Sequence, residues 1–358
     1  MNARKTLDIA VLPGDGIGPE TVDAALAVVT AALVKYDVAW APRRLPIGFE
    51  ALHAVGTTMP ESSFERARDA DGVILGPVSH NEYPSADEGG VNPSGTLRKR
   101  LDLYSNVRPA KTVGGLPSRV PGTMDLVIVR ENTEGFYADR TMYAGTGEFM
   151  PTPDLAMAMR KVTRAGSERI ARYAFALAQT RRKKLTAVHK ANVLRMSDGL
   201  FLDVMRGVRE EFPEVQYEEQ LVDAMAALLI RKADDFDVVV TTNMFGDILS
   251  DEATEISGGI GLAASLNVGD EHAVAQAQHG SAPTLANQDV ANPSSLIGSA
   301  AMLLEWISVK FNDERLMSAA ADIKRAVEAI VKNPATRTRD LGGVLGTRAF
   351  TRAVIERL

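Results

Sequence analysis

Short apolar runs alternate with longer stretches of mixed polar and apolar residues along most of the chain. A run of about four to eight apolar residues between turn residues is typical of a buried strand. Six such runs lie at residues 7–12, 72–75, 126–129, 185–189, 215–220 and 237–242. The stretches between them favour helices; Val22, Leu26, Val29 and Leu33, for example, recur at helical spacing. This alternation predicts an α/β protein whose parallel or mixed central sheet is flanked by helices.

The same patterns predict where individual elements lie. We expect helices at residues 154–180 and 197–212, and two closing helices at about 294–311 and 316–331. Residues 142–150 are rich in glycine and interrupt the pattern, which favours a protruding loop or arm. Residues 279–293 show no periodicity, and we expect an irregular segment there.

The composition narrows the class of protein. The 358 residues suffice for two domains, and because no repeat or low-complexity linker is present, we expect residues 105–257 to form a small domain inserted into a large one, 1–104 plus 258–358. The net charge of −6 gives no reason to expect nucleic acid binding, and no apolar stretch approaches the roughly 20 residues that span a bilayer. The absence of cysteine excludes disulfides, zinc–thiolate sites and cysteine nucleophiles. A cytoplasmic enzyme is expected.

Two carboxylates lie one helical turn apart directly after the last apolar run. Asp247 and Asp251 follow Gly246, so we expect a strand, a turn and a helix that carries both acids on one face. Like charges at this spacing repel unless a cation or a strong donor lies between them. Hard divalent ions such as Mg²⁺ take carboxylate oxygens and usually keep positions open for substrate. The alternative is a solvated helix N-terminus, where acids are favourable.

A glycine-rich turn follows the first apolar run, with Gly14, Gly16 and Gly18 within five residues. Glycines between a strand and a helix can cradle a pyrophosphate, as in the Rossmann fold. The spacing here is GxGxG rather than GxGxxG, and the next expected strand, near 38–41, is followed by a proline and two arginines instead of an acid for a ribose diol. The match to the Rossmann fold is therefore weak, although a tight turn near a ligand is favoured.

Three arginines, Arg98, Arg108 and Arg130, lie near expected strand or helix ends. Arg108 and Arg130 adjoin apolar segments, where an unpaired guanidinium would be costly. A planar guanidinium binds a carboxylate through two parallel hydrogen bonds, so a ligand that carries carboxylates would explain this placement. The alternative for any one of them is a structural ion pair with a nearby acid, namely Glu131, Asp102 or Asp125. The three together with the acidic pair favour the ligand.

A lysine and a tyrosine are candidates for proton transfer. Lys190 follows the apolar run at 185–189, and a lysine at a buried strand end can have its pKa lowered by neighbouring cations. The hydroxyl of Tyr137 could serve as the opposing acid. Taken alone, each is more often a surface lysine or a core tyrosine.

Seven segments, spread over nearly the whole chain, resemble the β-decarboxylating dehydrogenases, which are the isocitrate and 3-isopropylmalate dehydrogenase family. They are LPGDGIGPE at 12–20, DLYSNVRP at 102–109, RENTEG at 130–135, HKANV at 189–193, VDAM at 222–225, NMFGDILSD at 243–251 and HGSAP at 279–283. No single segment is decisive, but all seven occur in the order that the family shows. The resemblance is strong for that reason.

The resemblance implies an isocitrate/isopropylmalate dehydrogenase-like fold of two domains that is distinct from the Rossmann fold. It implies a homodimer whose active sites take residues from both subunits, with residues 142–150 in an arm that embraces the partner. The reaction would be the oxidative decarboxylation of a 3-substituted (R)-malate. NAD or NADP would accept the hydride, and Mg²⁺ or Mn²⁺ would be the metal.

The resemblance also assigns roles to residues. Arg98, Arg108 and Arg130 would hold the malate carboxylates, and Asp247 and Asp251 would bind the metal. The partner subunit would supply Asp223, a metal ligand and catalytic residue, and Lys190, which would assist removal of the hydroxyl proton; Tyr137 would protonate the enol, and Asn92, Ser94 and Asn192 would contact the substrate. The cofactor residues would be Ile17, His279, Gly280, Ser281, Ala282, Pro283, Thr284 and Asn292.

The cofactor segment departs from the family's pattern. NAD-dependent members usually carry an aspartate directly after HGSAP, and NADP-dependent members often carry a lysine and a tyrosine, whereas this chain has Thr284. A glutamate expected shortly before the histidine is Gln276 or Gln278 here. We favour NAD, because no cation is obvious for a 2′-phosphate; Arg337 and Arg339 are the candidates if NADP is used.

The segment before Arg98 sets the pocket for the variable C3 group. Isopropylmalate enzymes usually have a glutamate and a leucine pair there, which makes an apolar wall, whereas Asn92 and Ser94 are polar and match the serine and asparagine of isocitrate enzymes only loosely. We therefore expect a polar or small C3 substituent, as in isocitrate, homoisocitrate, malate or tartrate. A 3-isopropylmalate dehydrogenase of leucine biosynthesis is the alternative.

Two other classes of function stay open at this point. A non-catalytic regulatory subunit of a hetero-oligomeric dehydrogenase should have lost some of the arginine, aspartate, lysine and tyrosine set, and all eight positions are present here. A hydroxy-acid dehydrogenase that does not decarboxylate its product should turn over without a metal.

Overall fold

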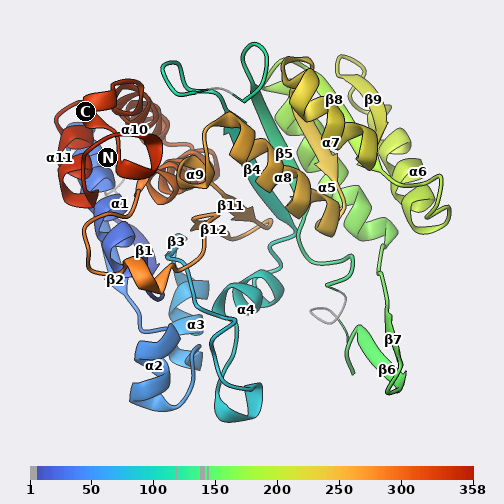
Figure 1. Cartoon of the computed structure of the whole chain (residues 1–358), viewed down its shortest axis with the longest axis horizontal. Coiled ribbons are helices and arrows are strands. Elements are labelled where there is room, and N and C mark those ends of the chain that lie inside the picture. Colours follow the sequence, from blue (N-terminus) through green and yellow to red (C-terminus); the bar gives the residue numbers. More distant parts are fainter. Residues whose placement is uncertain (1–5, 118, 138–141, 143–144) are drawn as a thin grey trace.

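The computed structural model describes residues 6–117, 119–137, 142 and 145–358, and shows an α/β protein built on one large sheet (Figure 1). Its strands are β1 (Leu7–Leu12), β2 (Trp40–Arg44), β3 (Gly72–Leu75), β4 (Ser105–Lys111), β5 (Asp125–Glu131), β6 (Glu148–Thr152), β7 (Leu155–Ala158), β8 (Lys184–His189), β9 (Gln216–Leu221), β10 (Val238–Thr241), β11 (Leu266–Val268) and β12 (Ala273–Gln276). Its helices are α1 (Gly18–Lys35), α2 (Gly48–Val55), α3 (Glu61–Asp69), α4 (Pro93–Arg100), α5 (Arg164–Gln179), α6 (Ser197–Arg209), α7 (Val222–Arg231), α8 (Asn243–Ser257), α9 (Ser294–Phe311), α10 (Glu314–Lys332) and α11 (Thr347–Ile355).

Ten strands form the central sheet in the order β2-β1-β3-β12-β11-β4-β5-β10-β8-β9. Pairing is antiparallel between β12 and β11, between β11 and β4, and between β4 and β5, and it is parallel elsewhere in this sheet. The predicted α/β fold with a mixed central sheet flanked by helices is confirmed. The sheet is continuous across the predicted domain boundary, since β11 pairs directly with β4.

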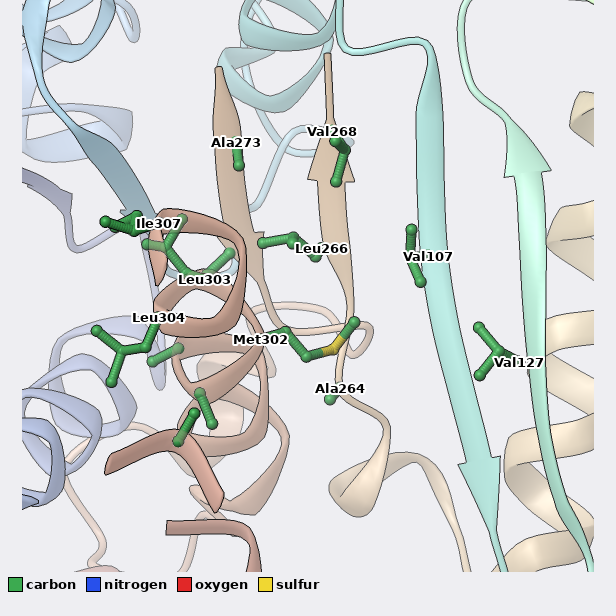
Figure 2. Packing of buried hydrophobic residues seen from close by; sticks show 14 of the residues in the cluster. Val107, Val127, Ala264, Leu266, Val268, Ala273, Met302, Leu303, Leu304 and Ile307 are labelled. Atoms are coloured by element: carbon green, nitrogen blue, oxygen red, sulfur yellow. The ribbon is translucent and has the colours of Figure 1, made fainter. Parts of the chain in front are cut away.

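Side chains alternate between the two faces of a strand, so each strand contributes to two layers. On one face a single large core cluster joins the sheet to α1, α5, α6, α9, α10 and α11. Figure 2 shows part of this cluster, where Met302 and Leu303 of α9 pack toward Leu266 of β11. The apolar runs in the sequence reflect burial of the parallel strands β1, β3, β8 and β10 on both faces.

The other face carries two separate core clusters. One lies under α3 and α4, and the second lies under α7 and α8. Between them, the strands β12, β11 and β4 present polar side chains on this face, namely Gln276, Asn267, Ser265, Asn106 and Arg108. Apolar packing is therefore interrupted at the middle of the sheet, which leaves room for a polar site.

The predicted helix at 154–180 is wrong in its first part. Residues 155–158 form β7, which pairs with β6 in an antiparallel hairpin, and α5 begins only at Arg164. The hydroxyl of Thr163 accepts a hydrogen bond from the backbone N–H of Gly166 and so caps the helix there. Large apolar side chains of the hairpin, including Phe149 and Met157, are exposed, so no core selects a helix in this segment.

Several other expectations are met. The six predicted strands are present within two residues, and the predicted helices at 197–212, 294–311 and 316–331 correspond to α6, α9 and α10. The expected second strand, near 38–41, is β2, which begins at Trp40. Of the predicted arm at 142–150, residues 143 and 144 lie outside the described residues, and β6 begins at Glu148. Among the described residues, no helix is long and apolar enough to cross a membrane.

Candidate active site

A cavity of about 350 Å³ lies between α4 and α8, above the polar middle of the sheet. Of the residues predicted from the sequence, its lining includes Asn92, Ser94, Arg98, Arg108, Arg130, Tyr137, Asp247, His279 and Gly280. Apart from Asn92, just before α4, and Tyr137, after β5, these residues come from α4, β4, β5, α8 and the loop after β12, which are far apart in the sequence. The fold therefore brings most of the predicted substrate site and the start of the cofactor segment into one place.

Arg130 is fixed before any ligand arrives. It lies at the end of β5 with only 2% of its surface exposed. Its Nε donates to the backbone carbonyl of Asn243 at 3.0 Å, Nη2 donates to the Asn243 Oδ1 at 2.7 Å, and Nη1 donates to Asp247. The helix α8 can approach this closely because Gly246 has no side chain; a Cβ there would lie 2.6 Å from the Cγ of Arg130.

Arg108 lies beside Arg130, on β4, and is also buried. Its Nε donates to the Asn106 Oδ1 at 2.6 Å, and its Nη1 donates to the Ser250 Oγ at 2.7 Å and to the Asp251 Oδ1 at 3.3 Å. Burial, together with the second cation, lowers the pKa of Arg108 to about 10, so the guanidinium stays protonated at neutral pH.

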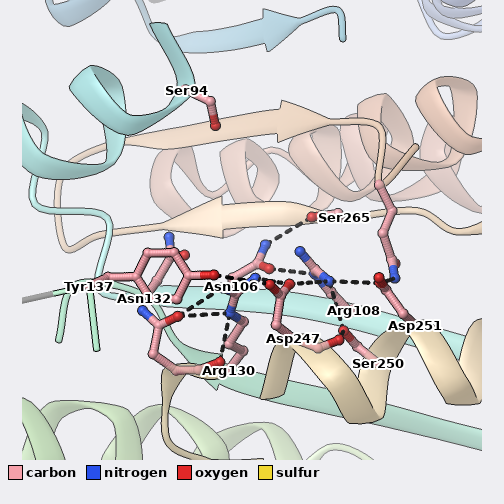
Figure 3. Close-up of polar contacts among 12 residues, drawn as sticks. Ser94, Asn106, Arg108, Arg130, Asn132, Tyr137, Asp247, Ser250, Asp251 and Ser265 are labelled. Atoms are coloured by element: carbon pink, nitrogen blue, oxygen red, sulfur yellow. Dashed lines mark hydrogen bonds and ion pairs between the residues drawn. The ribbon is translucent and has the colours of Figure 1, made fainter. Parts of the chain in front are cut away.

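The two acids of α8 face these arginines (Figure 3). The Asp247 Oδ1 is an acceptor for Arg130 and lies 3.2 Å from the Nη1 of Arg108, and its Oδ2 accepts from the hydroxyl of Tyr137 at 3.3 Å. Asp251 is more exposed and accepts from the Nε2 of Gln278 at 2.5 Å. The repulsion expected between acids one turn apart is thus balanced by cations, and the solvated helix terminus is not what the structure shows.

The acids named as alternative partners of the three arginines are engaged elsewhere. Asp102 pairs with Arg169 and Asp125 pairs with Arg181. The buried Glu131 accepts from the backbone N–H and hydroxyl of Thr133. The buried arginines of the cavity are therefore directed to Asp247 and Asp251 rather than to these acids.

Lys190 and Asp223 form a separate site. The Nζ of Lys190 donates to the Asp223 Oδ1 at 2.5 Å, and this hydrogen bond holds the pKa of Asp223 below its ordinary value. The side chain of Asp223 is 64% exposed, and Asn192 is exposed in the adjoining turn. As far as the chain is described, the lining of the cavity includes none of these three residues.

The donor set at α8 fits a hard divalent cation only in part. Asp247 and Asp251 offer carboxylate oxygens of the kind that Mg²⁺ and Mn²⁺ prefer. Within the described residues, no group of three or more His, Cys, Asp or Glu side chains is close enough to hold a metal ion. In the part of the chain that the structure describes, the cavity side of α8 therefore offers two carboxylates.

The first glycine turn packs against the loop after β12. The backbone N–H of Ile17 donates to the carbonyl of Ser281 at 2.8 Å, and the hydroxyls of Ser79 and Ser281 lie 2.7 Å apart. A Cβ on Gly16 would lie 2.1 Å from that same carbonyl oxygen. The buried carboxylate of Asp15 organises the turn, since it accepts from the backbone N–H of Phe49, the backbone N–H of Ser79 and the hydroxyl of Tyr83. The turn thus positions the predicted cofactor loop.

The predicted cofactor loop contains an unsatisfied polar atom. The Nε2 of His279 is buried and has no hydrogen-bond partner among the described residues, while its Nδ1 lies 3.0 Å from the carbonyl of Gly280. Burial lowers the pKa of His279, so the ring is neutral at pH 7. A buried ring nitrogen without a partner fits a site that a polar ligand completes. Thr284 and Pro283 are exposed on the same loop.

Two residues near this loop alter what the sequence predicted about cofactor binding. Asp340 was not predicted; its Oδ2 accepts from the Nδ2 of Asn292 at 2.9 Å. Arg337, a candidate for binding a 2′-phosphate, is buried, and its guanidinium donates to the backbone carbonyls of Val331, Lys332 and Gly115. The hydrogen-bonding groups of Arg337 are therefore used by backbone carbonyls. Arg339, which is exposed, is the other candidate for binding a 2′-phosphate.

The chain as a whole matches a known family. Residues 8–358 match the family model described as isocitrate/isopropylmalate dehydrogenase. The chain belongs to the isocitrate/isopropylmalate dehydrogenase family. It is 40% identical over 347 residues to the 3-isopropylmalate dehydrogenase of Archaeoglobus fulgidus, covering 97% of this chain and 98% of that protein. It is also 40% identical over 353 residues to the isocitrate/homoisocitrate dehydrogenase of Thermus thermophilus, with 98% of each covered.

A solved structure agrees with this family assignment. The isocitrate dehydrogenase from Methylococcus capsulatus superposes with a TM-score of 0.86 at 38% identity, covering 98% of this chain and 99% of that chain. As a member of the isocitrate/isopropylmalate dehydrogenase family, the protein is an enzyme that catalyses oxidative decarboxylation. The names of its relatives differ in substrate, so membership identifies the reaction and not the malate on which it acts.

Proposed function

We propose that this enzyme oxidises and decarboxylates a 3-substituted (R)-malate that has a polar or small group at C3, with NAD as the hydride acceptor and Mg²⁺ or Mn²⁺ as the metal. The observation that carries the proposal is the convergence of Arg98, Arg108 and Arg130 with Asp247 and Tyr137 in one cavity. Three guanidinium groups suit a substrate with several carboxylates. Two carboxylates on one helix face suit a divalent ion that bridges protein and substrate.

Each of these residues has its own role in the proposed reaction. When bound, the nicotinamide would take the hydride from C2, and the metal would act as a Lewis acid on the C2 oxygen. Lys190 of a partner subunit would receive the proton of the C2 hydroxyl. Loss of CO₂ from the carboxylate on C3 would then leave an enolate, and Tyr137 would donate the proton to C3 that gives the 2-keto acid. Arg108 and Arg130 hold the carboxylates in place, and because both are fixed in advance, they lose little freedom on binding.

The proposed site is shared between two subunits. Lys190 and Asp223 are paired with each other on a partly exposed surface outside the cavity, and among the described residues the acidic pair of α8 has no third carboxylate close enough to share a metal. A homodimer in which each subunit contributes these two residues to the active site of the other would explain both observations. The exposed apolar hairpin of β6 and β7 supports the same assembly.

We also propose that the chain divides into a small domain, residues 105–257, and a large domain, residues 1–104 plus 258–358, and that the enzyme is cytoplasmic.

The preference for NAD rests on charge near the cofactor loop. The carboxylate of Asp340 lies beside Asn292 and contributes to the electrostatic environment of His279. An acid there would repel a 2′-phosphate and could accept from a ribose hydroxyl. Arg337 is committed elsewhere, which removes one of the two cations considered for NADP.

The decisive experiment is a panel of substrates against both cofactors. Isocitrate, homoisocitrate, malate, tartrate and 3-isopropylmalate are each tested with NAD and with NADP in the presence of Mn²⁺, and reduced cofactor is followed by absorbance at about 340 nm. We expect NAD-linked turnover of at least one malate with a polar or small C3 group. Turnover confined to 3-isopropylmalate would contradict this substrate class and favour a 3-isopropylmalate dehydrogenase. No turnover with any of them would favour the regulatory subunit.

Two further measurements separate the remaining alternatives. EDTA should abolish turnover, whereas a dehydrogenase without decarboxylation would be insensitive to it. Inactive Lys190→Ala and Asp247→Asn proteins should regain activity when their subunits are exchanged. Half of the dimers would then be mixed, each with one intact site of two, so we expect about a quarter of the wild-type rate. No recovery after proven exchange would contradict a shared site.

A further inference from the structure

Lys190 is held by its backbone, while its side chain lies on a partly exposed surface. The backbone N–H of Lys190 donates to the Oδ2 of Asp198 at 2.6 Å. Its carbonyl accepts from the backbone N–H of Leu194 at 2.8 Å. The side chain is 26% exposed and pairs with the surface carboxylate of Asp223. The turn that carries Lys190 is therefore fixed in part by the carboxylate of Asp198.

Asp198 is a fully buried acid whose two oxygens both have partners. Its side chain has no exposed surface, and the side chain of Arg160 beside it is 8% exposed. The Nη1 of Arg160 donates to the Asp198 Oδ1 at 2.5 Å and to the Ser197 Oγ at 2.8 Å. Asp198 also lies in the first turn of α6, where a negative charge is favourable. The carboxylate is thus held in one position between a guanidinium and the N–H of Lys190.

Arg160 joins the same group to the start of α8. Its Nη2 donates to the Thr242 Oγ1 at 2.8 Å, and its guanidinium lies 5.4 Å from the centre of the Phe245 ring. Thr242 immediately precedes α8, the helix that carries Asp247. A substitution at Asp198 that leaves Arg160 in place therefore preserves these contacts with α8.

We propose that Asp198 is a positioning residue, which fixes the backbone of Lys190 so that the amine can act in the active site of the partner subunit. This inference rests on the proposed function, in which Lys190 receives the proton of the C2 hydroxyl. As far as the chain is described, Asp198 does not line the cavity, so it acts through Lys190. A shift of about 1 Å at a catalytic group can cost about a hundredfold in rate, and loss of this hydrogen bond would permit such a shift.

Asp198→Asn is the first test, because asparagine has the shape of aspartate but one acceptor oxygen fewer. Its amide group must face either the guanidinium of Arg160 or the N–H of Lys190, and both are donors. The charged donor makes the stronger hydrogen bond and keeps the oxygen, so the N–H of Lys190 loses its acceptor. We expect kcat to fall about tenfold to a hundredfold, for the malate that the wild-type enzyme oxidises fastest.

The KM for that malate should change by less than about threefold, because Arg108 and Arg130 keep the partners that hold them for the substrate carboxylates. Asp203→Asn is the matched control. It makes the same substitution on α6, at a side chain that is 68% exposed, and should leave both kcat and KM at the wild-type values.

Exchange of subunits shows whether the loss passes through Lys190. The Asp198→Asn protein is mixed with Asp247→Asn and, separately, with Lys190→Ala, and native mass spectrometry verifies the mixed dimers. With Asp247→Asn, each mixed dimer has one site with sound acids and a sound lysine, so we expect about a quarter of the wild-type rate. With Lys190→Ala, every site of a mixed dimer takes a defective lysine, so the rate should not exceed the mean of the two parent proteins. Damage that reached α8 would give the opposite pattern.

The outcomes separate this inference from the proposed function. Recovery with Lys190→Ala, no recovery with Asp247→Asn, an unchanged kcat in Asp198→Asn, or an equal loss in Asp203→Asn would each overturn the inference. If Lys190→Ala and Asp247→Asn do not restore each other, the shared site fails and this inference falls with it.

Thermal unfolding shows whether Asp198→Asn is folded, because it leaves the buried Arg160 without its carboxylate. If it is not folded, Asp198→Glu takes its place in the kinetics and in the exchange. Glutamate keeps a negative charge for Arg160 but displaces the carboxylate by one methylene group, so the same loss of kcat and the same pattern of recovery are expected. A fully active Asp198→Glu protein would contradict the role of Asp198 in positioning Lys190.

Discussion

Replacement of Gly246 by alanine tests how tightly the site depends on the packing of α8 against β5. An added Cβ would lie 2.6 Å from the Cγ, 2.7 Å from the Cβ and 3.2 Å from the Cα of Arg130. Ordinary carbon contacts are about 3.5–4.0 Å, so the two elements must separate by about 1 Å. Arg130 cannot easily yield, because its guanidinium is held by Asn243 and Asp247.

Stability and activity should respond very differently to Gly246→Ala. Alanine is favoured over glycine inside a helix by about 1 kcal/mol, and overpacking costs about 1–3 kcal/mol, so the free energy of unfolding should fall by about 0–2 kcal/mol. A displacement of about 1 Å at a catalytic group can cost about a hundredfold in rate. We therefore expect kcat/KM to fall by about two orders of magnitude while the protein stays folded.

The assay for Gly246→Ala combines urea unfolding with steady-state kinetics. Gly207→Ala is the matched control, because Gly207 lies on α6, where an added Cβ meets nothing within 4 Å. That control should be stabilised by about 0.5–1 kcal/mol with activity unchanged. If Gly246→Ala is as stable and as active as Gly207→Ala, the close contact with Arg130 does not position Asp247, and the reasoning is refuted.

Three further predictions concern proton transfer, pH and the first turn. Lys190→Ala and Asp247→Asn should each lose most of kcat with little change in thermal stability, and near-normal kcat in either would contradict the assigned roles. The pKa of His279 is lowered from 6.5 by burial, so the unfolded chain binds more protons as the pH falls, and the free energy of unfolding should decrease below about pH 6.5; His279→Gln should reduce this slope in urea titrations. Asp15→Asn removes a charged acceptor from three donors and should lower the free energy of unfolding by about 1.5–3 kcal/mol, and an unchanged urea midpoint would contradict that role.

The sequence pattern predicted strands correctly where both faces of the strand are buried. The strands β1, β3, β5, β8 and β10 are apolar on both faces, and their runs are visible without further information. β4, β11 and β12 were missed because they form the floor of the site and carry polar side chains such as Asn106, Asn267 and Gln276 on one face. A search for apolar runs therefore misses these strands, because the polar residues that the site needs interrupt their apolar pattern.

The candidate site was predictable in its residue types but not in its contacts. Arg108 and Asp247 are separated by 139 residues, and the local sequence gives no sign that β4 and α8 lie against each other. Asn243 and Ser250, which hold the two buried arginines, could have been suspected because both lie on the α8 face that carries the acids. Asp340 gave no local signal, since it lies about 60 residues beyond the loop of His279 that it approaches.

The hairpin of β6 and β7 shows where local pattern misleads. The apolar residues of β7 are compatible with a helix continued backward from α5, but in the described chain the side chains of β7 are exposed. Their conformation is selected by pairing between two strands. The glycine-rich break at 142–150 predicted a loop or arm there, and the resemblance to the family added only the expectation that the arm contacts a partner subunit.

The pairing of β11 with β4 has a consequence for protein engineering. Leu266 lies opposite Val107 and Val268 lies opposite Ser105, so the sheet crosses the proposed domain boundary without a hinge loop at that point. A chimera that takes one half from another relative must reproduce this register, because a slip of one residue would turn Arg108 and Asn106 away from the cavity. Substrate preference is therefore more safely transplanted as single side chains than as a whole domain.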